Sequence, residues 1–326
     1  MKRNTEIKTV TLAESIRLRP AMYLGWLNQN GIEHEIAAFL FSLIPLDNSA
    51  RFIFTLDGDT ISMKAESIVT DKYKYYFEPK DEYGKLWDNR RLHDPLSIFV
   101  LACASETSQL TVSGEKEIFR VSSIKNQFEC KCEAHKDSLH TLEMSFIPDK
   151  EIFVSLRLRF DYFLNFFYQQ SFLLPYLTIE LNNKITHEHV IFSNSGGMSD
   201  YADTLFHQLG RMPEFRFDNK IKLSNYELEA VIAYMPEYCD KKPIIKMWAE
   251  GDYLYGGSLE NGILKGISKA FPVKDDPSKR LVLCAHIKGD YFAFEGSVKD
   301  KLKMSELETE LEHIIFTELK LKAKKK

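Results

Sequence analysis

The chain has 326 residues, a length typical of two domains. Its 43 Lys and Arg residues against 47 Asp and Glu residues give a formal net charge of −4, which excludes a broadly basic nucleic-acid coat but not a local basic patch. Hydrophobic residues make up 44% of the chain and aromatic residues 13%, so global disorder is excluded as well.

Neither a membrane helix nor a secretory signal is visible, because no apolar run reaches about 18 residues and the opening MKRNTEIKTV lacks an apolar stretch. We therefore expect a cytoplasmic protein with no membrane partner. The five cysteines are scattered and odd in number, which argues against a disulfide framework. Cys130 and Cys132 lack a second Cys/His pair at zinc spacing, and the alternation in QFECKC favours a strand. No metal site is predicted.

In the first half, apolar residues at helical spacing predict a helix over 31–44 that Pro45 ends. The stretches RFIFTL and ISMKAE flank an Asp-Gly-Asp turn, a pattern typical of a β-hairpin. Residues 71–95 have no hydrophobic period and predict a loop or lid. A helix over 96–105 and four alternating strands between 110 and 147 follow, so we expect a sheet with helices on one face.

The second half alternates helices and strands. Its patterns predict an aromatic helix over 160–174, a helix over about 199–209, a polar loop from Arg211 to Asn225, strands in YELEAVIAYM and PIIKMW, a helix over 258–271 that Ser258 caps, a buried strand RLVLCAHIK, and a last helix that opens with the capping box Ser305-x-x-Glu308. Gly262 and Gly266 lie inside a helix, where each costs about 1 kcal/mol relative to Ala. This cost indicates that another element packs closely against them.

Four motifs stand in an order that resembles the gyrase B and topoisomerase IV ParE family. They are SIRLRPAMYLG at 15–25 with GIEHE at 31–35, GGMSDY at 196–201, GGS at 256–258, and FEGSVKDKL at 294–302. The corresponding family patterns are V-R-K-R-P-G-M-Y-I-G with G-L-H-H, G-G-[IL]-x-x-[FY], G-G-T, and F-x-x-Q-T-K-x-K-L. The resemblance covers nearly the whole chain.

The resemblance implies an α+β fold. Residues 1–192 would form a GHKL (Bergerat) ATPase-like sandwich, and residues 193–326 a gyrase-B-type transducer domain of the ribosomal protein S5 domain 2-like type. In that family the first domain binds ATP and Mg²⁺. A Glu activates the attacking water, an Asn one helical turn later holds Mg²⁺, an Asp reads the adenine amino group, and glycine-rich loops wrap the phosphates.

These functional residues are missing here. When the motifs are aligned on Gly31, the water-activating Glu falls on Ala38, the Mg²⁺-binding Asn on Ser42, and the adenine-binding Asp on Ala65. Alanine has no basic atom, and a Ser hydroxyl is a poor ligand for a hard cation. Residues 91–98, where the phosphate loop should lie, contain no glycine. We therefore expect no catalytic residue and a degenerate nucleotide site.

One displaced replacement for the lost pair is Asp47-Asn48, six residues too far along the chain. It lies beyond Pro45 and about 240° from the required helix face. Two remnants of the nucleotide site survive in the alignment. Lys299 matches the lysine that reaches from the transducer to the terminal phosphate, with a surface or interface lysine as the alternative. Tyr23 matches a tyrosine near the nucleotide and the dimer arm, with core packing as the alternative.

The basic tail offers a candidate DNA contact. Its lysines are Lys320, Lys322, Lys324, Lys325 and Lys326. A solvated helix end is the alternative interpretation. If DNA is bound, we expect binding without sequence preference and with a steep salt dependence.

Together these observations predict a gyrase-B-like pseudo-ATPase without a cofactor, acting as a binding or regulatory module linked to DNA topology or to a topoisomerase partner. The expected partners are a second copy or a gyrase-type subunit, with residues 1–14 as a dimer arm. One alternative is a divergent but active ATPase subunit of a split topoisomerase-like machine, which would use ATP and Mg²⁺. Another is an interaction scaffold unrelated to DNA. No cleavage domain is recognisable, so strand passage by this chain alone is not expected.

Overall fold

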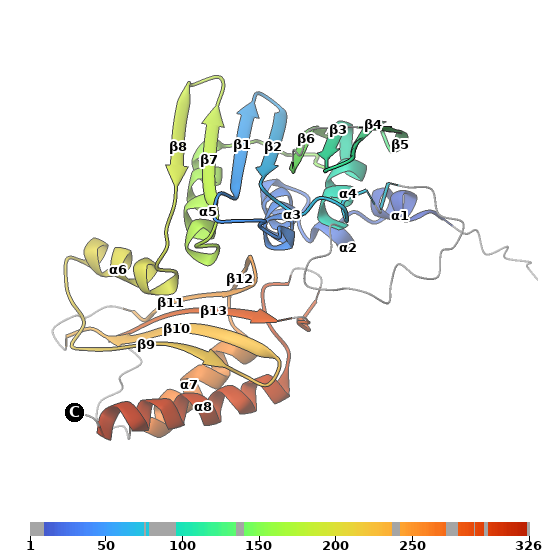
Figure 1. The fold of residues 1–326 in the computed structure, drawn as a ribbon. Coiled ribbons are helices and arrows are strands. Elements are labelled where there is room, and N and C mark those ends of the chain that lie inside the picture. Colours follow the sequence, from blue (N-terminus) through green and yellow to red (C-terminus); the bar gives the residue numbers. More distant parts are fainter. Residues whose placement is uncertain are drawn as a thin grey trace, which may run out of the picture.

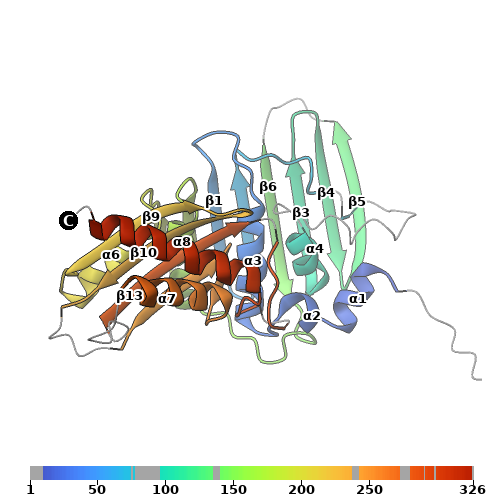
Figure 2. The same cartoon turned by 90° about the horizontal axis from the view of Figure 1, so that it is seen from below.

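The computed structural model describes residues 10–74, 76–77, 96–134, 140–236, 242–271, 280–289, 291–296 and 299–324, which form two sheets with helices on their faces (Figures 1 and 2). Residues 1–9 of the expected dimer arm and most of the predicted 71–95 loop lie outside these ranges.

The first sheet has eight strands in the order β5-β4-β3-β6-β2-β1-β7-β8. Its strands are β1 Arg51–Asp57, β2 Thr60–Glu66, β3 Ser105–Ser113, β4 Glu117–Ile124, β5 Gln127–Ala134, β6 Thr141–Pro148, β7 Thr178–Asn183 and β8 Glu188–Phe192. Neighbouring strands run antiparallel, except that β1 and β7 are parallel.

Helices cover one face of this sheet, as predicted (Figure 2). They are α1 Leu12–Leu18, α2 Ala21–Leu24, α3 Gln29–Ser42, α4 Leu96–Cys103 and α5 Phe160–Leu173. In β1, residues of one face are buried and those of the other are partly exposed, the period-2 pattern of a one-sided sheet. Phe52 and Phe54 of this strand pack against Phe167 of α5, with ring centroids 5.7 and 5.0 Å apart. The predicted β1–β2 hairpin is confirmed, with Gly58 at a positive φ of 60° in its turn.

The second sheet has the order β12-β11-β13-β10-β9. Its elements are α6 Met198–Leu209, β9 Phe215–Lys222, β10 Tyr226–Tyr234, β11 Ile244–Ala249, β12 Asp252–Leu254, α7 Ser258–Ala270, β13 Leu281–Gly289 and α8 Ser305–Lys324. Helices α7 and α8 lie on the face away from the first sheet, and α6 lies on the facing side (Figure 1). The predicted polar loop at 211–225 is wrong, because β9 forms within it and pairs with β10 along its whole length.

Two predicted helix caps are also wrong. Gly257, at a φ of 93°, is the N-cap of α7, and Ser258 already lies inside the helix. The Ser258 hydroxyl instead accepts a hydrogen bond from the backbone N–H of Met304 at 2.8 Å. Likewise α8 begins at Ser305, so this residue occupies the first helical position rather than the cap. Ser258 lies where two segments of the second half meet, a contact that local sequence does not reveal.

The close packing predicted at the two helical glycines is confirmed. A Cβ atom on Gly262 would lie 2.8 Å from the Leu311 Cβ, and one on Gly266 would lie 2.8 Å from the Ile315 Cβ. Separations below about 3 Å are not tolerated, so any side chain would force α7 and α8 apart. The glycines therefore set the distance between these helices.

At the start of α6, backbone N–H groups of the Gly196-Gly197 motif and of Met198 contact two carboxylates. The backbone N–H of Gly196 donates to the Asp200 carboxylate at 3.0 Å, and the N–H of Met198 donates to Glu229 at 3.1 Å. A Cβ on Gly197 would lie 2.6 Å from the Glu229 carboxylate. Carboxylates at a helix N-terminus are favourable because its N–H groups lack partners within the helix. This motif therefore holds α6 on β10.

The larger hydrophobic core runs from the helices of the first sheet into the second half, where it includes Phe206, Trp248 and Cys284. A second core lies between β9–β13 and the α7–α8 pair. Within the described ranges no helix combines the length and apolar composition needed to cross a bilayer.

Candidate functional site

Helix α3 places the candidate site residues, because it lies between the first sheet and the second half of the chain (Figure 1). Asn28 caps it, with its side-chain oxygen accepting from the backbone N–H of Asn30 at 2.9 Å. Gly31 allows the chain to turn tightly into the helix, since a Cβ there would lie 1.9 Å from the carbonyl oxygen of Trp26.

Ala38 and Ser42 lie one turn apart on α3 but have different surroundings. Ala38 is exposed, whereas Ser42 is only 1% exposed. The Ser42 hydroxyl donates to the Phe39 carbonyl at 2.7 Å and lies 3.2 Å from the hydroxyl of Tyr73. That tyrosine is buried and packs edge-on against Phe39, with ring centroids 5.9 Å apart. The hydroxyl at the metal-binding position is therefore engaged within the protein.

Ala65 lies fully buried in β2, opposite Phe52 of β1 and Leu142 of β6. It has apolar neighbours on both sides and offers no group that could read an adenine. Residues 91–95 of the expected phosphate loop lie outside the described residues, while Ser97 and Ile98 are buried in α4.

An aromatic cluster packs beside these positions, between the 76–77 turn, α4 and β5. The Phe99 ring lies 5.2 Å from Phe77, 5.5 Å from Phe128 and 6.0 Å from Tyr76, measured between centroids. The two cysteines of β5 contact neighbouring groups: Cys130 donates to the Phe77 carbonyl at 3.3 Å, and Cys132 donates to Glu117 at 3.2 Å. No group of three potential metal ligands occurs among the described residues.

On the opposite side, α3 carries a polar cluster that joins it to the second half of the chain. His34 Nδ1 lies 2.5 Å from the carboxylate of Asp252 in β12, and His34 Nε2 lies 3.2 Å from the ammonium of Lys299. The Glu35 carboxylate is 3.9 Å from the same Nε2. His34 and Glu35 are 8% and 5% exposed, so these charges interact in a site that water hardly screens.

Burial shifts the titration of this cluster. It raises the pKa of Glu35 to about 7, although the charges of His34 and Lys299 favour the ionised form. Burial also raises the pKa of Glu33 to about 7, against a hydrogen bond from Gln29. For His34, burial lowers the pKa, but the charge and hydrogen bond of Asp252 outweigh it, so the pKa is raised.

A cavity of about 420 Å³ opens beside this cluster, between α3, α5 and the second sheet. Glu33 and His34 line it from α3, Tyr162 and Phe166 from α5, and Lys299 from the second half. The aromatic helix α5 therefore buries Phe163 and Phe167 in the core and turns other rings toward the cavity.

Of the two predicted remnants, the structure brings Lys299 to α3 but leaves Tyr23 elsewhere. The Tyr23 hydroxyl lies 2.9 Å from the Ser15 hydroxyl, and its ring packs against the core beside α1. Lys299 does not extend into solvent. It has a positive φ of 58° and contacts His34.

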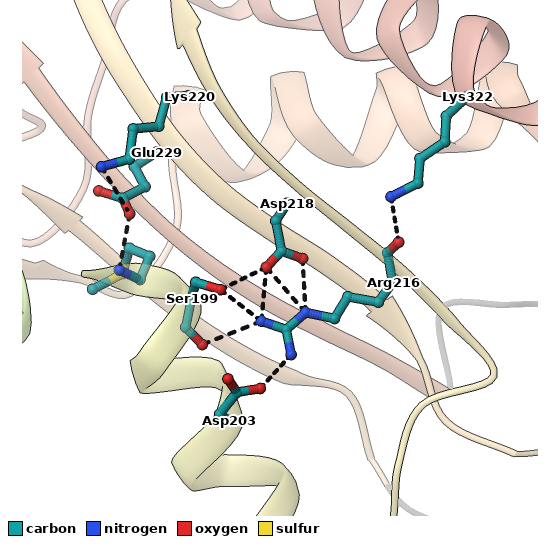
Figure 3. Close-up of polar contacts among 8 residues, drawn as sticks. Ser199, Asp203, Arg216, Asp218, Lys220, Glu229 and Lys322 are labelled. Carbon is teal, nitrogen blue, oxygen red and sulfur yellow. Dashed lines mark hydrogen bonds and ion pairs between the residues drawn. The ribbon is translucent and has the colours of Figure 1, made fainter. Parts of the chain in front are cut away.

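The described lysines of the basic tail make contacts within the chain. Lys322 donates to the backbone carbonyl of Arg216 at 2.6 Å (Figure 3). Its ammonium lies 5.3 Å from the centre of the Phe217 ring. The Lys320 ammonium lies 5.8 Å from the Phe316 ring. The side chain of Lys324 and both Lys325 and Lys326 lie outside the described residues.

Arg216 itself ties β9 to α6. Its guanidinium donates to Asp218 at 2.8 Å and to the Ser199 hydroxyl at 2.7 Å, and it pairs with Asp203 (Figure 3). Lys220 lies 3.6 Å from Glu229 on the same sheet face. The positive charge on this surface is therefore largely matched by carboxylates.

Searches for known relatives agree with this architecture. No family model matches the chain. The B subunit of DNA gyrase from Helicobacter pylori is 21% identical over 340 aligned positions, which cover 92% of this chain and 43% of that protein. The B subunit of the type 2 topoisomerase from Aquifex aeolicus is 25% identical, covering 81% of this chain and 36% of that protein. The chain thus spans less than half the length of these relatives.

Solved structures give the same result for the fold. The B-subunit of DNA gyrase from Myxococcus xanthus superposes with a TM-score of 0.74 at 15% identity, covering 95% of both chains. The ATPase region of Saccharomyces cerevisiae topoisomerase II has a TM-score of 0.64 at 14% identity, covering 99% of this chain and all of that one. The chain therefore has an α+β fold. Within that class its architecture is that of the gyrase B ATPase region, as the sequence motifs predicted.

No local pattern in the sequence indicated the His34–Asp252 contact. Asp252 is 218 residues from His34, and Lys299 is 265 residues away. His34 lies in the recognised GIEHE motif, but its role depends on β12, a three-residue strand that the pattern did not predict.

Proposed function

We propose that the chain is a gyrase-B-like pseudo-ATPase that acts as a binding or regulatory module. Residues 1–192 would form its degenerate ATPase-like domain and residues 193–326 its transducer-like domain. The observation that carries this proposal is the state of Ser42, whose hydroxyl is buried and bonded to Phe39 and Tyr73 where a Mg²⁺ ligand would be needed.

Two further observations support the loss of ATP hydrolysis. Ala38 offers no base to activate water, and losing a general base alone typically reduces a rate by about 10²–10⁴. Ala65 offers no hydrogen-bond acceptor on its side chain, and it lies between apolar neighbours. Binding and chemistry are therefore both affected.

A calorimetric titration tests this proposal. We expect no measurable heat of binding when a non-hydrolysable ATP analogue with Mg²⁺ is added to the purified chain. The ATPase domain of Thermus thermophilus gyrase B, which has the same fold with a TM-score of 0.69, is a matched positive control. Micromolar affinity in this chain would instead support the divergent active ATPase.

The partner follows from the same comparison. The relatives are named as subunits of gyrase and of a type 2 topoisomerase, which supports a second copy or a gyrase-type subunit as the partner. A ligand shifts an equilibrium only by its differential affinity for the two states. A chain that does not bind ATP would therefore keep one oligomeric state, for which we propose a constitutive dimer.

Light scattering over a concentration series, with and without the ATP analogue, tests this second part. We expect a dimer whose mass does not respond to the analogue. Duplex DNA added at two salt concentrations then tests the Lys320–Lys326 tail, where binding should weaken steeply with salt. A strict monomer that ignores both DNA and a gyrase B subunit would contradict the binding-module function and favour an unrelated scaffold.

A further inference from the structure

Lys299, His34 and Asp252 come from three separate segments and form one hydrogen-bonded chain. Lysine can only donate, so the Lys299–His34 contact at 3.2 Å requires an unprotonated Nε2 on His34. The other ring nitrogen then carries the proton and donates to Asp252 at 2.5 Å. This hydrogen-bond pattern therefore corresponds to a neutral histidine.

The backbone after Lys299 is held firmly to the second sheet and α7. Asp300 accepts from the backbone N–H of Tyr255 at 2.8 Å, and Leu302 accepts from that of Ser258 at 2.8 Å. A Cβ on Gly257 would lie 2.3 Å from the Leu302 carbonyl oxygen, so the two strands of backbone are in close contact. Residues 299–304 thus move with the second sheet, and the Lys299 side chain is their link to α3.

Lys299 also adopts an uncommon backbone conformation. Its φ of 58° lies in the left-handed region, which for a residue with a Cβ typically costs about 1 kcal/mol or more. Such a conformation persists when the surrounding contacts over-determine it. The contacts present are the backbone hydrogen bonds of residues 300–304 and the hydrogen bond from the Lys299 ammonium to His34.

Charged groups surround His34 on every side. Asp252 faces Nδ1 from β12, Lys299 and Glu35 face Nε2, and Glu33 and Lys246 line the adjacent cavity. Protonation of Nε2 would remove the acceptor that Lys299 uses and place two positive charges 3.2 Å apart. The carboxyl group of Glu35, 3.9 Å from Nε2, would then be the nearest acceptor for the new N–H, through an oxygen that accepts in either protonation state.

We propose that Lys299, His34 and Asp252 form a proton-operated latch between α3 and the second half of the chain. With His34 neutral, Lys299 docks the 299–304 segment on α3. Protonation of Nε2 turns His34 toward Glu35 and releases Lys299. Against the effect of burial, the charge and hydrogen bond of Asp252 raise the pKa of His34 from its ordinary value, so this exchange occurs at a higher pH than it would for a free imidazole. The latch is proposed for the chain without nucleotide.

Hydrogen exchange in the full chain, without nucleotide, tests the latch. After correction for intrinsic exchange, we expect amides in the N-terminal half of α3, where the latch closes, to exchange about tenfold faster at pH 6 than at pH 8.5, because the amides of Lys303 and Met304 keep their hydrogen bonds within the second half. In Lys299→Met, which keeps the length of the side chain, exchange should be fast at both pH values. In Lys301→Ala, a neighbouring lysine outside the cluster, the wild-type dependence should remain.

His34→Gln separates the latch from a general effect of pH. A glutamine can accept from Lys299 and donate to Asp252 but cannot gain a proton, so exchange should stay slow at both pH values. A histidine NMR titration gives an independent measure. The pKa of His34 should rise in Lys299→Met and fall in Asp252→Asn. A pH step in exchange that persists in His34→Gln, or a His34 pKa that is unchanged in Lys299→Met, would overturn the proposal.

Discussion

The two flanks of α3 differ in how they fill the space beside the helix. Around Ser42, the space is filled by the hydroxyl of Tyr73 and by the aromatic rings of Tyr73 and Phe39. Around His34, four ionisable groups remain, two of them nearly inaccessible to solvent. Buried charges are costly to retain, because each loses several kcal/mol of solvation. The contrast indicates that packed side chains fill the Ser42 flank, whereas the His34 flank keeps its electrostatic link to the second half of the chain.

Removing the tyrosine side chain should give the largest effect on the packed flank. Tyr73→Ala leaves a cavity beside Phe39, so we expect the free energy of unfolding to fall by about 3–5 kcal/mol. Tyr73→Phe removes only the hydroxyl and should cost about 1 kcal/mol. Urea denaturation of both variants measures the difference. Equal losses would show that the hydroxyl, rather than the ring, stabilises this flank.

Titration of Glu35 should dominate the polar flank. The folded chain holds this proton up to about pH 7, whereas an unfolded chain releases it near pH 4.5. The folded state therefore binds more protons in this window, and the free energy of unfolding falls as the pH rises through it, by about 2–3 kcal/mol. Glu33 is less buried but also has a pKa raised to about 7, so it contributes in the same window. Glu35→Gln should therefore reduce this dependence without abolishing it, and it should be more stable than the wild type at pH 8.

Chemical denaturation at pH 5 and pH 8 checks this expectation, with Glu115→Gln in the exposed β3–β4 turn as a control. His34 contributes a dependence of the same sign at higher pH, since its raised pKa also means that stability is lost as it deprotonates. The contribution of His34 to the pH dependence of stability should remain in Glu35→Gln. If the free energy of unfolding of Glu35→Gln changed with pH as strongly as that of the wild type, the dependence would come from other groups.

The smallest effects are expected on restoring the two missing residues. Ser42→Asn puts a larger side chain into a filled site and should cost about 1–3 kcal/mol. Ala38→Glu, at an exposed position, should change stability by no more than about 0.5 kcal/mol. The double variant should still fail to hydrolyse ATP, as measured by phosphate release. Turnover in this variant would show that the site retains its other parts.

The sequence predicted much of the fold because the signals for many helices and strands lie within short stretches of the chain. The β1–β2 hairpin, the alternating strands β3–β6 and the close packing at Gly262 all follow from spacing within a few residues. The prediction missed β9 because Asn219 interrupts its alternation of Phe215, Phe217 and Ile221, and pairing with β10 decides its conformation.

The candidate site divides in the same way. Residue type and spacing alone predict that Ala38 and Ser42 stand where the family has Glu and Asn. The hydrogen bond between Ser42 and Tyr73, by contrast, depends on a turn 31 residues away. Lys299 was recognised by its motif, whereas its partner His34 depends on how the two halves meet. The sequence therefore predicts which functional groups of the family's site are absent, and tertiary contacts determine what surrounds the residues at those positions.

The close contacts at the two glycines make α7 and α8 a rigid helix pair in the second half of the chain. Without a Cβ at Gly262 or Gly266, the backbone of α7 fits against α8 so closely that neither helix can slide along the other without collision. The 20 residues of α8 extend about 30 Å. A rotation of about 10° where this pair meets β12 and residues 299–304 would therefore displace the far end of α8 by roughly 5 Å. If release of the proposed latch near α3 turned this helix pair, the helix that carries the lysine tail would therefore move by this distance at its far end.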